Sequence, residues 1–262
     1  MVRWVEPSAA RPFDSDPQSK AVPLTEAQVR EWRERKCCAV DGVWPAQLVA
    51  RVAADASSIF RGASTGAALQ ADGYAATALG RNAMAFPCGR SPALNEATLH
   101  PRLLAAVSQL LGEERVAGVR LTQSEAWLKS STAHEPNYDQ RMHCDFPNHT
   151  LTMPPAEDSQ PEAVSMLAYW DDVDDVGGPT FVVPRRGDDD PAYQQPLTCM
   201  PGVAFANGEP VPYIDSRESA EAFFVAHDST VAAFRQSLYE REEAVRFHVG
   251  TILFYQQDTW RK

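Results

Sequence analysis

The sequence lacks the features of secreted, membrane and nucleic-acid-binding proteins. Its N-terminus has neither the apolar core nor the small-residue cleavage site of a secretory signal, and no apolar run approaches the length that spans a bilayer. Basic residues are outnumbered, because 24 Lys and Arg stand against 35 Asp and Glu and give a formal net charge of -11. Nucleic acids and anionic membrane surfaces would repel such a chain. We therefore expect a cytoplasmic protein that binds a small molecule, and neither nucleic acid nor membrane.

Several sequence motifs of common enzyme classes are also missing. There is no GxGxxG fingerprint, no P-loop and no recognisable Ser-His-Asp or Cys-His nucleophile arrangement. The cysteines form no CxxC pair and have no finger-like spacing, which indicates unpaired thiols in a reducing compartment. The five cysteines are Cys37, Cys38, Cys88, Cys144 and Cys199.

The N-terminal part is predicted to begin with an extended lead-in and a helix. Residues 1–23 are rich in Pro, Ser, Asp and Ala and have no periodicity, so they are expected to lie extended over the surface. Thr25 and Gln28 have the spacing of a capping box, which predicts a helix over about 26–36.

Residues 24–112 as a whole are expected to form a mainly helical support layer. The glycine-rich stretch between about 61 and 92 shows no sustained period, and long loops of this kind are usually lids or binding loops. The other expected elements are a β-prone run at 37–43, a helix after Pro45, and a helix from Pro101 that ends near Gly112.

From residue 116 onward the pattern changes to short β-like runs. Short strands joined by turns, without regular crossover helices, indicate an antiparallel sandwich or barrel. A helical insertion is predicted at 215–243. The runs are 116–121, 125–129, the region of His143, 164–170, 180–183 and 245–255. The length of 262 residues suits one large β-rich domain or two small ones, and we favour a single domain over 1–262.

His143 and Asp145 form the candidate metal site. On a strand their side chains share one face, while that of Cys144 points to the other. An imidazole and a carboxylate, joined by a second histidine, make the facial triad of non-haem Fe(II) oxygenases. A chance His-x-Asp pair occurs in roughly one chain in three of this composition. The pair therefore gains meaning only from its surroundings.

Six motifs surround and include this pair in a fixed order. They are Leu24-Thr25-Glu26, Asp41-Gly42-Val43, His143-Cys144-Asp145, the turn at 175–180, Val182-Val183-Pro184 and the strand at 250–254. The order covers nearly the whole chain and resembles the phytanoyl-CoA dioxygenase family of Fe(II)/2-oxoglutarate-dependent oxygenases.

The resemblance implies a β-rich α+β fold, in which a double-stranded β-helix, a jelly-roll barrel of cupin-like type, carries the metal at its wider mouth. His143 and Asp145 would be ligands of Fe(II), and 2-oxoglutarate would be the cosubstrate. Family members decarboxylate 2-oxoglutarate to succinate and usually hydroxylate a C–H bond, so a small or lipid-like organic substrate is expected. Lys129 and Thr180 are candidates to contact the cosubstrate.

The end of the sequence departs from the family pattern. In relatives a Trp is followed at once by the distal metal histidine, and about ten residues later by an arginine that pairs with 2-oxoglutarate. Here Trp260 is followed by Arg261 and Lys262. We therefore expect a C-terminally truncated barrel without its last strands, the third ligand or the cosubstrate arginine, and with reduced stability. The alternative to an oxygenase is a catalytically inactive jelly-roll protein that binds a ligand or a metal.

The remaining histidines, the aspartate-rich turn and two arginines are the other polar residues that could lie at the site. Surface or structural roles are the commoner case for the remaining histidines, which are His100, His134, His149, His227 and His248. The aspartates at 171, 172, 174 and 175 lack the Gly and distal Glu of a calcium loop, so a solvated turn is expected. Arg185 and Arg186 either face an anionic group near the mouth or are solvated charges.

Overall fold

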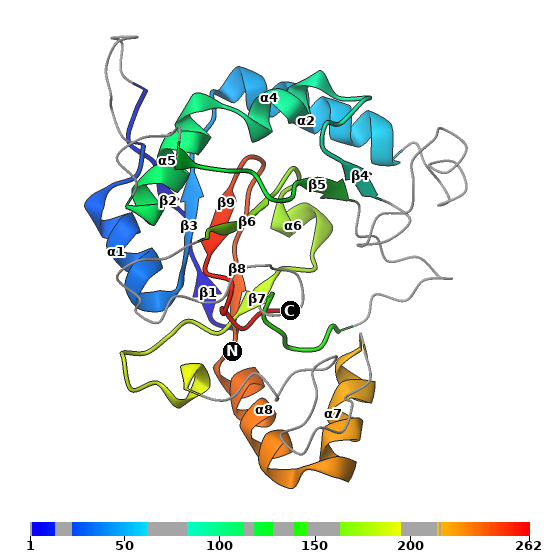
Figure 1. Ribbon diagram of the computed structural model, residues 1–262. Helices are drawn as coiled ribbons and strands as arrows, with labels where there is room; N and C mark the ends of the chain where they lie inside the picture. Colours follow the sequence, from blue (N-terminus) through cyan, green and yellow to red (C-terminus); the bar gives the residue numbers. More distant parts are fainter. Residues whose placement is uncertain are drawn as a thin grey trace.

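A four-stranded sheet lies at the centre of the computed structural model (Figure 1). The structure describes residues 2–13, 23–61, 83–112, 118–127, 139–145, 163–194, 214 and 216–262. The sheet has the order β2 (Ser8–Ala9), β3 (Cys37–Asp41), β9 (Ile252–Tyr255) and β6 (Ser165–Ala168). The central strand β9 pairs antiparallel with both β3 and β6, so that Phe254 faces Cys38 on one side and Met166 on the other.

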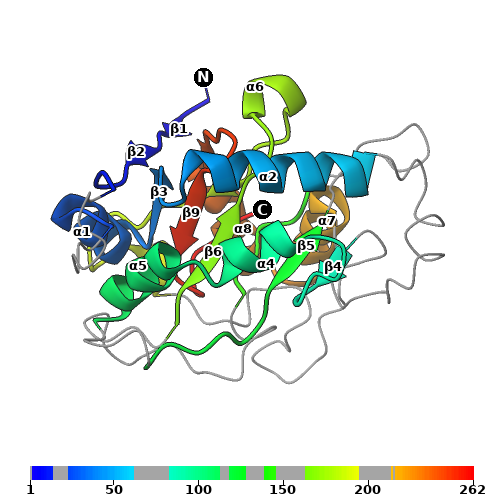
Figure 2. The ribbon, with the colours of Figure 1, turned by 90° about the horizontal axis from the view of Figure 1, so that it is seen from above.

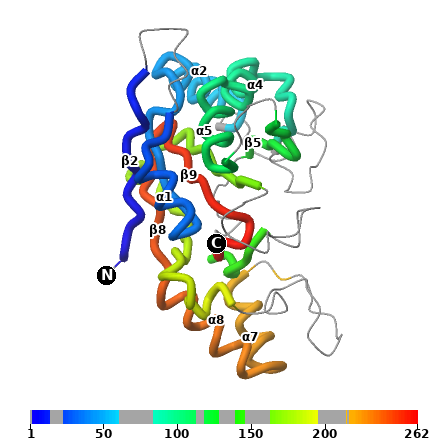
Figure 3. The backbone as a smooth tube through the Cα atoms, turned by 60° about the vertical axis from the view of Figure 1, so that its left-hand side comes forward, coloured from blue at the N-terminus to red at the C-terminus, as the bar shows by residue number. Residues whose placement is uncertain are grey.

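A second sheet contains the strands β1 (Trp4–Val5), β8 (Glu243–Val245) and β7 (Phe181–Val182). β1 runs parallel to β8, and β2 runs parallel to β3, so the N-terminal lead-in crosses both sheets (Figure 3). The sequence predicts the extended conformation of this lead-in correctly, but not its pairing. A separate antiparallel pair consists of β4 (Ala83–Ala85) and β5 (Glu125–Trp127).

Alternation along β9 separates two clusters of buried side chains. Ile252 and Phe254 point into a large cluster shared with the N-terminal helices, while Leu253 and Tyr255 point into a smaller cluster shared with β1, β7 and β8. All four residues of β9 are buried. A strand that is covered on both faces reads as a continuous apolar run, which explains why its sequence is Ile-Leu-Phe-Tyr.

The first helix, α1 (Glu26–Arg35), confirms the predicted capping box. The Thr25 hydroxyl accepts a hydrogen bond from the Gln28 N–H at 3.2 Å, and the Gln28 side-chain oxygen accepts one from the Thr25 N–H at 2.8 Å. The helix ends at Lys36, whose φ of 65° places it in the left-handed region. Its buried face carries Trp32, which packs beside Leu24 in the large cluster.

Three further helices cover the four-stranded sheet on the side of the large cluster (Figures 1 and 2). They are α2 (Ala46–Ala56), which continues into the π-helical turn η1 (Ser57–Arg61), α4 (Pro92–Thr98) and α5 (Pro101–Leu111). α5 begins at a proline and ends at Gly112 with a φ of 70°, as predicted. The predicted loop over 61–92 contains β4 at its end, and residues 62–82 lie outside the described part of the chain.

The helices α7 (Arg217–His227) and α8 (Ser229–Arg241) lie beyond the second sheet (Figure 1). They form a hairpin within the predicted insertion, and the Asp228 carboxylate caps α8 by accepting bonds from two backbone N–H groups. The aspartate-rich turn contains the short helix α6 (Val173–Val176), and η3 (Pro191–Tyr193) precedes the hairpin. No helix among the described residues is long and apolar enough to cross a membrane.

The α+β fold is as expected, but the described residues do not form the jelly-roll barrel, even as the truncated one that the sequence predicts. Their strands are two to five residues long and form small separate sheets that do not close. The run predicted at 116–121 forms no strand over 118–121, and the run at 125–129 is a strand only to Trp127 within the described residues. Strand propensity fails as a guide where a run has no partner to complete its backbone hydrogen bonds.

The central position of Phe254 leads to a stability prediction. Its side chain is fully buried between β3, β6 and the helices, so Phe254→Ala should lower the free energy of unfolding by about 3–5 kcal/mol. Val225 on α7 is 69% exposed, so Val225→Ala should change it by no more than about 0.5 kcal/mol. Urea unfolding of both variants measures the difference. Equal changes in the free energy of unfolding would show that packing around Phe254 does not stabilise the fold more than a surface contact does.

Candidate functional site

His143 and Asp145 lie on an extended segment that pairs with the C-terminal residues. The His143 N–H donates to the Arg261 carbonyl at 2.9 Å, and the Arg261 N–H donates to the His143 carbonyl at 2.8 Å. The Asp145 N–H donates to the Gln257 carbonyl at 3.1 Å. The His143 ring lies with its Nδ1 3.2 Å from the Arg141 carbonyl, which can only accept, so this nitrogen carries the proton. The pairing fixes the backbone of both candidate ligands.

Both carboxylate oxygens of Asp145 have protein partners. Oδ1 forms an ion pair with Nη2 of Arg261, and Oδ2 accepts a hydrogen bond from the Tyr255 hydroxyl at 2.8 Å. The Asp145 side chain is only 12% exposed. A buried carboxylate is costly unless it is paired and hydrogen-bonded, and here both conditions are met.

The Arg261 guanidinium is held as a cation by its surroundings. Burial alone would lower its pKa, but Tyr255 and Asp145 together raise the pKa above its ordinary value. The guanidinium also lies over the Tyr255 ring, 4.9 Å from the centroid. Burial raises the pKa of the Tyr255 hydroxyl, so that group remains protonated and acts as a donor to Asp145.

Cys144 points away from this cluster, as the alternation of a strand predicts. Its thiol is buried, lies 3.1 Å from the Asp258 carbonyl and packs with Met142, Leu238 and Trp260. Burial raises the pKa of the Cys144 thiol well above its ordinary value, so it is not a reactive thiolate. The described cysteines are all free and buried, and Cys199 lies outside the described residues.

The C-terminal segment, residues 256–262, is anchored on both sides of Arg261. The Trp260 indole N–H donates to the Ala192 carbonyl at 2.7 Å, and the Trp260 carbonyl accepts from the Val183 N–H at 2.9 Å. The Phe181 N–H donates to the Lys262 carbonyl at 3.0 Å. Arg261 therefore lies between two residues whose positions the second sheet and η3 fix.

Lys36 secures the beginning of the same segment. Its ammonium lies 3.0 Å from the Asp258 carboxylate and 3.0 Å from the Gln256 side-chain oxygen, and its side chain is 5% exposed. The Lys36 carbonyl accepts bonds from the Thr259 hydroxyl and the Gln256 N–H, both at 2.9 Å. The end of α1 is thereby joined to the turn that leads to Arg261.

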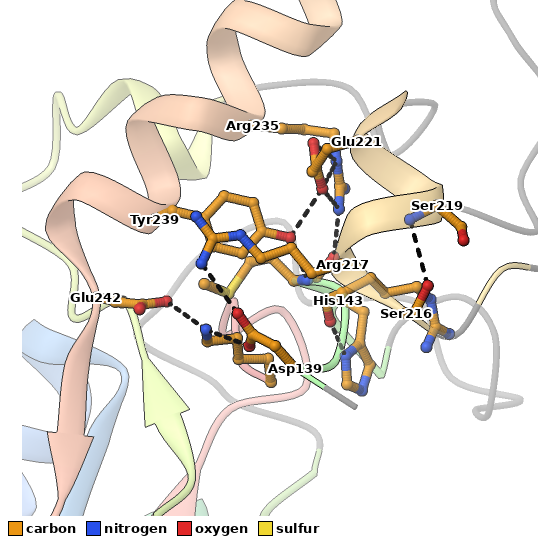
Figure 4. A network of polar contacts seen from close by, with 12 residues as sticks. Asp139, His143, Ser216, Arg217, Ser219, Glu221, Arg235, Tyr239 and Glu242 are labelled. Atoms are coloured by element: carbon orange, nitrogen blue, oxygen red, sulfur yellow. Dashed lines mark hydrogen bonds and ion pairs between the residues drawn. The ribbon is translucent and has the colours of Figure 1, made fainter. Parts of the chain in front are cut away.

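The helix hairpin α7–α8 holds the other side of the candidate site (Figure 4). Arg235, which is fully buried, forms an ion pair with Glu221 at 2.7 Å and donates to the Met142 carbonyl at 3.0 Å. The Tyr239 hydroxyl accepts from the Met142 N–H at 2.9 Å and donates to Glu221 at 2.8 Å. Both backbone groups of the residue before His143 are thus bound by side chains of the hairpin.

Asp139 adds a second link between the hairpin and the C-terminus. Its carboxylate lies 3.0 Å from the Arg217 guanidinium and 2.6 Å from the Lys262 ammonium, while Arg217 also lies over the Tyr239 ring (Figure 4). Burial alone would raise the pKa of Asp139, but the two cations lower it. The segment 139–145 is therefore held at two points, by the ion pairs of Asp139 and by the contacts of Arg235 and Tyr239 with Met142.

Thr180 lies close to this cluster, because its partner Tyr169 is near enough to Arg261 for the guanidinium to affect the pKa of Tyr169. The Thr180 hydroxyl accepts a hydrogen bond from Tyr169 at 2.9 Å. Burial raises the pKa of Tyr169 to about 12, although the Arg261 guanidinium lowers it. Lys129 lies outside the described residues. Arg185 donates to the carbonyls of Arg33 and Glu34 at 2.9 Å, so it caps the C-terminus of α1 and is not a ligand-facing group.

The described histidines other than His143 have structural roles, as predicted. His100 caps α5, His227 stacks on Phe223, and His248 lies 2.8 Å from Asp172 in a surface turn. Hydrogen bonding to Asp172 raises the pKa of His248. His134 and His149 fall outside the described residues.

The described residues around Asp145 do not fit an iron ion. In the part of the chain that the structure describes, no group of three or more His, Cys, Asp and Glu side chains is arranged to hold a metal. The Asp145 oxygens already bind Arg261 and Tyr255, so the carboxylate has no oxygen without a protein partner. The cluster is a neutral ion pair with a phenol donor.

Sequence reasoning found His143 and Asp145 but missed the residues that hold them. From the sequence, Arg261 stands out only as the residue in place of an expected histidine. Its ion pair with Asp145 cannot be predicted from the sequence. Arg235 and Glu221 carried a signal, because charged residues within predicted amphipathic helices at an apolar face are unusual unless they are paired. The sequence does not show which helix faces meet, so it does not predict that Arg235 pairs with Glu221.

Comparisons with known proteins agree with the resemblance found in the sequence. The family model "Phytanoyl-CoA dioxygenase (PhyH)" matches residues 34–196. No curated protein matches the chain in sequence.

Solved structures show the same fold at low identity. EctD from S. alaskensis in its apo form has a TM-score of 0.56 and 17% identity, over 96% of this chain and 76% of that chain. The alpha-ketoglutarate-dependent carbocyclase SnoK from nogalamycin biosynthesis has a TM-score of 0.52 and 16% identity, over 91% and 76%. The epimerase SnoN, in complex with Fe3+, alpha-ketoglutarate and nogalamycin RO, has a TM-score of 0.51 and 18% identity, over 90% and 75%. Other EctD structures contain Fe, or 2-oxoglutarate with 5-hydroxyectoine.

The buried ion pair of the hairpin leads to a second prediction. Arg235→Met should lower the free energy of unfolding by about 3–5 kcal/mol, because it leaves Glu221 without its counter-charge and removes the hydrogen bond to the Met142 carbonyl. The matched control is Arg51→Met, since the Arg51–Glu96 pair is about half exposed and should contribute less than about 1 kcal/mol. Urea unfolding measures both changes in the free energy of unfolding. If Arg235→Met lowers it as little as the control does, the buried ion pair does not hold the hairpin against the strand of His143.

Proposed function

The chain belongs to the phytanoyl-CoA dioxygenase family of Fe(II)- and 2-oxoglutarate-dependent oxygenases, and we propose that it is a member without iron-dependent turnover. In this proposal it is a catalytically inactive protein of the jelly-roll class that binds a small organic molecule. One observation carries the proposal: the Arg261 guanidinium is bound to Asp145, the carboxylate that would serve as a metal ligand.

Electrostatics explains why Arg261 and iron exclude each other. The buried carboxylate is already neutralised by one cation, so a divalent ion at Asp145 would stand beside a fixed positive charge. At a separation of 4 Å and an effective dielectric constant of 20, that repulsion is roughly 8 kcal/mol. A term of this size corresponds to more than five powers of ten in affinity. Iron could bind at Asp145 only if Arg261 first left it.

A second candidate is the oxygenase activity of the family. It is favoured by the position of His143 and Asp145, which lie two residues apart on one extended segment with fixed backbone. The reaction would hydroxylate a small or lipid-like organic substrate while 2-oxoglutarate becomes succinate, with Lys129 and Thr180 near the cosubstrate. His134 or His149 would then have to serve as the third ligand.

Anaerobic titration with Fe(II) and 2-oxoglutarate distinguishes the two functions. We expect the full chain to show no metal-to-ligand charge-transfer band and, on admission of air, no succinate above a protein-free control. EctD from S. alaskensis, whose structures contain Fe and 2-oxoglutarate, serves as the positive control. A stoichiometric band with succinate formation, both lost in His143→Ala, would refute the proposal and establish the oxygenase.

A further inference from the structure

The side chains of His143, Asp145 and Arg261 converge on one side of a short antiparallel pair. His143 and Arg261 exchange both backbone hydrogen bonds, which makes them a directly opposed pair whose side chains point to the same face. Asp145 follows two residues after His143 and returns to that face, where its carboxylate meets the Arg261 guanidinium. Asp145 and Arg261 are therefore in side-chain contact, and His143 lies directly opposite Arg261 on the neighbouring segment.

Charge at this contact is balanced by protein groups alone. Asp145 contributes one negative charge, Arg261 one positive charge, and the protonated Tyr255 completes the hydrogen bonding of the carboxylate. The guanidinium thus has the electrostatic role that a bound cation would have beside the same carboxylate. The guanidinium also lies over the face of the Tyr255 ring, which stabilises the cation through a cation–π interaction.

We propose that Arg261 is a built-in substitute for a divalent metal ion: its guanidinium takes the place of the metal beside Asp145 and supplies no metal ligand there. The inference rests on the proposed function and adds to it that the identity of residue 261 decides whether this site holds a cationic side chain or a metal. It follows that replacing only this side chain by an imidazole converts the pair His143 and Asp145 into a three-ligand site. Such a site of two imidazoles and one carboxylate accepts divalent first-row metals.

The surrounding contacts leave the backbone at position 261 independent of its side chain. Trp260 is fixed through the Ala192 and Val183 backbones, and Lys262 is fixed through Phe181 and Asp139. The bridge between Arg261 and His143 uses main-chain atoms only. A histidine at position 261 therefore keeps its Cα where the arginine has it and directs its ring toward Asp145.

Cobalt(II) binding to Arg261→His tests the inference without any turnover. The full-length variant should bind one Co(II) per chain at pH 7.5, with visible d–d absorption and a Kd at least about tenfold lower than that of the wild type. Arg261→Lys keeps the cation and Arg261→Gln removes it without adding a strong ligand, so neither should gain the band. Adding His143→Ala or Asp145→Asn to Arg261→His should abolish it.

The Co(II) titrations distinguish failure of this inference from failure of the proposed function. A folded Arg261→His variant, judged by circular dichroism and a single unfolding transition, that binds Co(II) no tighter than the wild type would overturn the inference. So would a gain that survives Asp145→Asn. If instead the wild type itself binds Co(II) tightly through His143 and Asp145, the proposed function fails, because the site would hold metal with Arg261 present.

A thermal double-mutant cycle keeps the inference testable if Arg261→His does not fold. As a buried ion pair with direct contact, Asp145 and Arg261 should be strongly coupled. Asp145→Asn and Arg261→Met should each lower Tm by roughly 10 °C, while the double variant should lower it by clearly less than their sum. Additive shifts would show that Arg261 does not neutralise Asp145, and would overturn the inference.

Discussion

The backbone pairing between His143 and Arg261 is the constraint on which the candidate site depends. It joins the C-terminal segment, residues 256–262, to the strand that carries the two candidate ligands, and the same segment is tied to α1 through Lys36 and to η3 through Trp260. Because β9 leads directly into it, the central strand of the main sheet positions Arg261. A carboxylate, a phenol and a guanidinium that come from distant parts of the sequence meet here as a result. The expectation of exposed strand edges at this end also fails locally, since Arg261 and Lys262 complete backbone bonds with His143 and Phe181.

Buried charge around this segment is neutralised in pairs. Arg261 with Asp145, Arg235 with Glu221, and Lys36 with Asp258 each place a cation and a carboxylate within hydrogen-bonding distance. Each pair also bonds to, or lies beside, a backbone group of the segments that it joins. Such pairs add little net stability over apolar packing, but removing one partner is strongly unfavourable. They therefore specify one arrangement of the hairpin α7–α8, the strand with His143 and the C-terminal segment, rather than increasing the stability of the fold in general.

Local sequence signals predicted the elements that local interactions determine. The capping box of α1 and the proline and glycine that bound α5 are predictable, because each depends on neighbours within a few residues. The parallel pairing of β1 with β8 was not predictable in this way, since its partners are about 240 residues apart. The same holds for Arg261 and Asp145, which are separated by 116 residues. Helical periodicity likewise predicted α8, but not that a fully buried arginine on it binds the backbone of Met142.

Family membership therefore has different consequences for the fold and for the chemistry of this chain. The fold requires that β9 be apolar on both faces and that the segment after it pair with the strand of His143, and any residue except proline at position 261 can make this pairing through its main chain. In the proposed function the side chain at this position decides against a metal, because a cation there neutralises Asp145 without disturbing the pairing. Arginine fits this position, because its charge and its planar donor group suit a carboxylate that is already bound by a tyrosine. Charge balance with Arg261 thus gives Asp145 a structural role that does not depend on a metal.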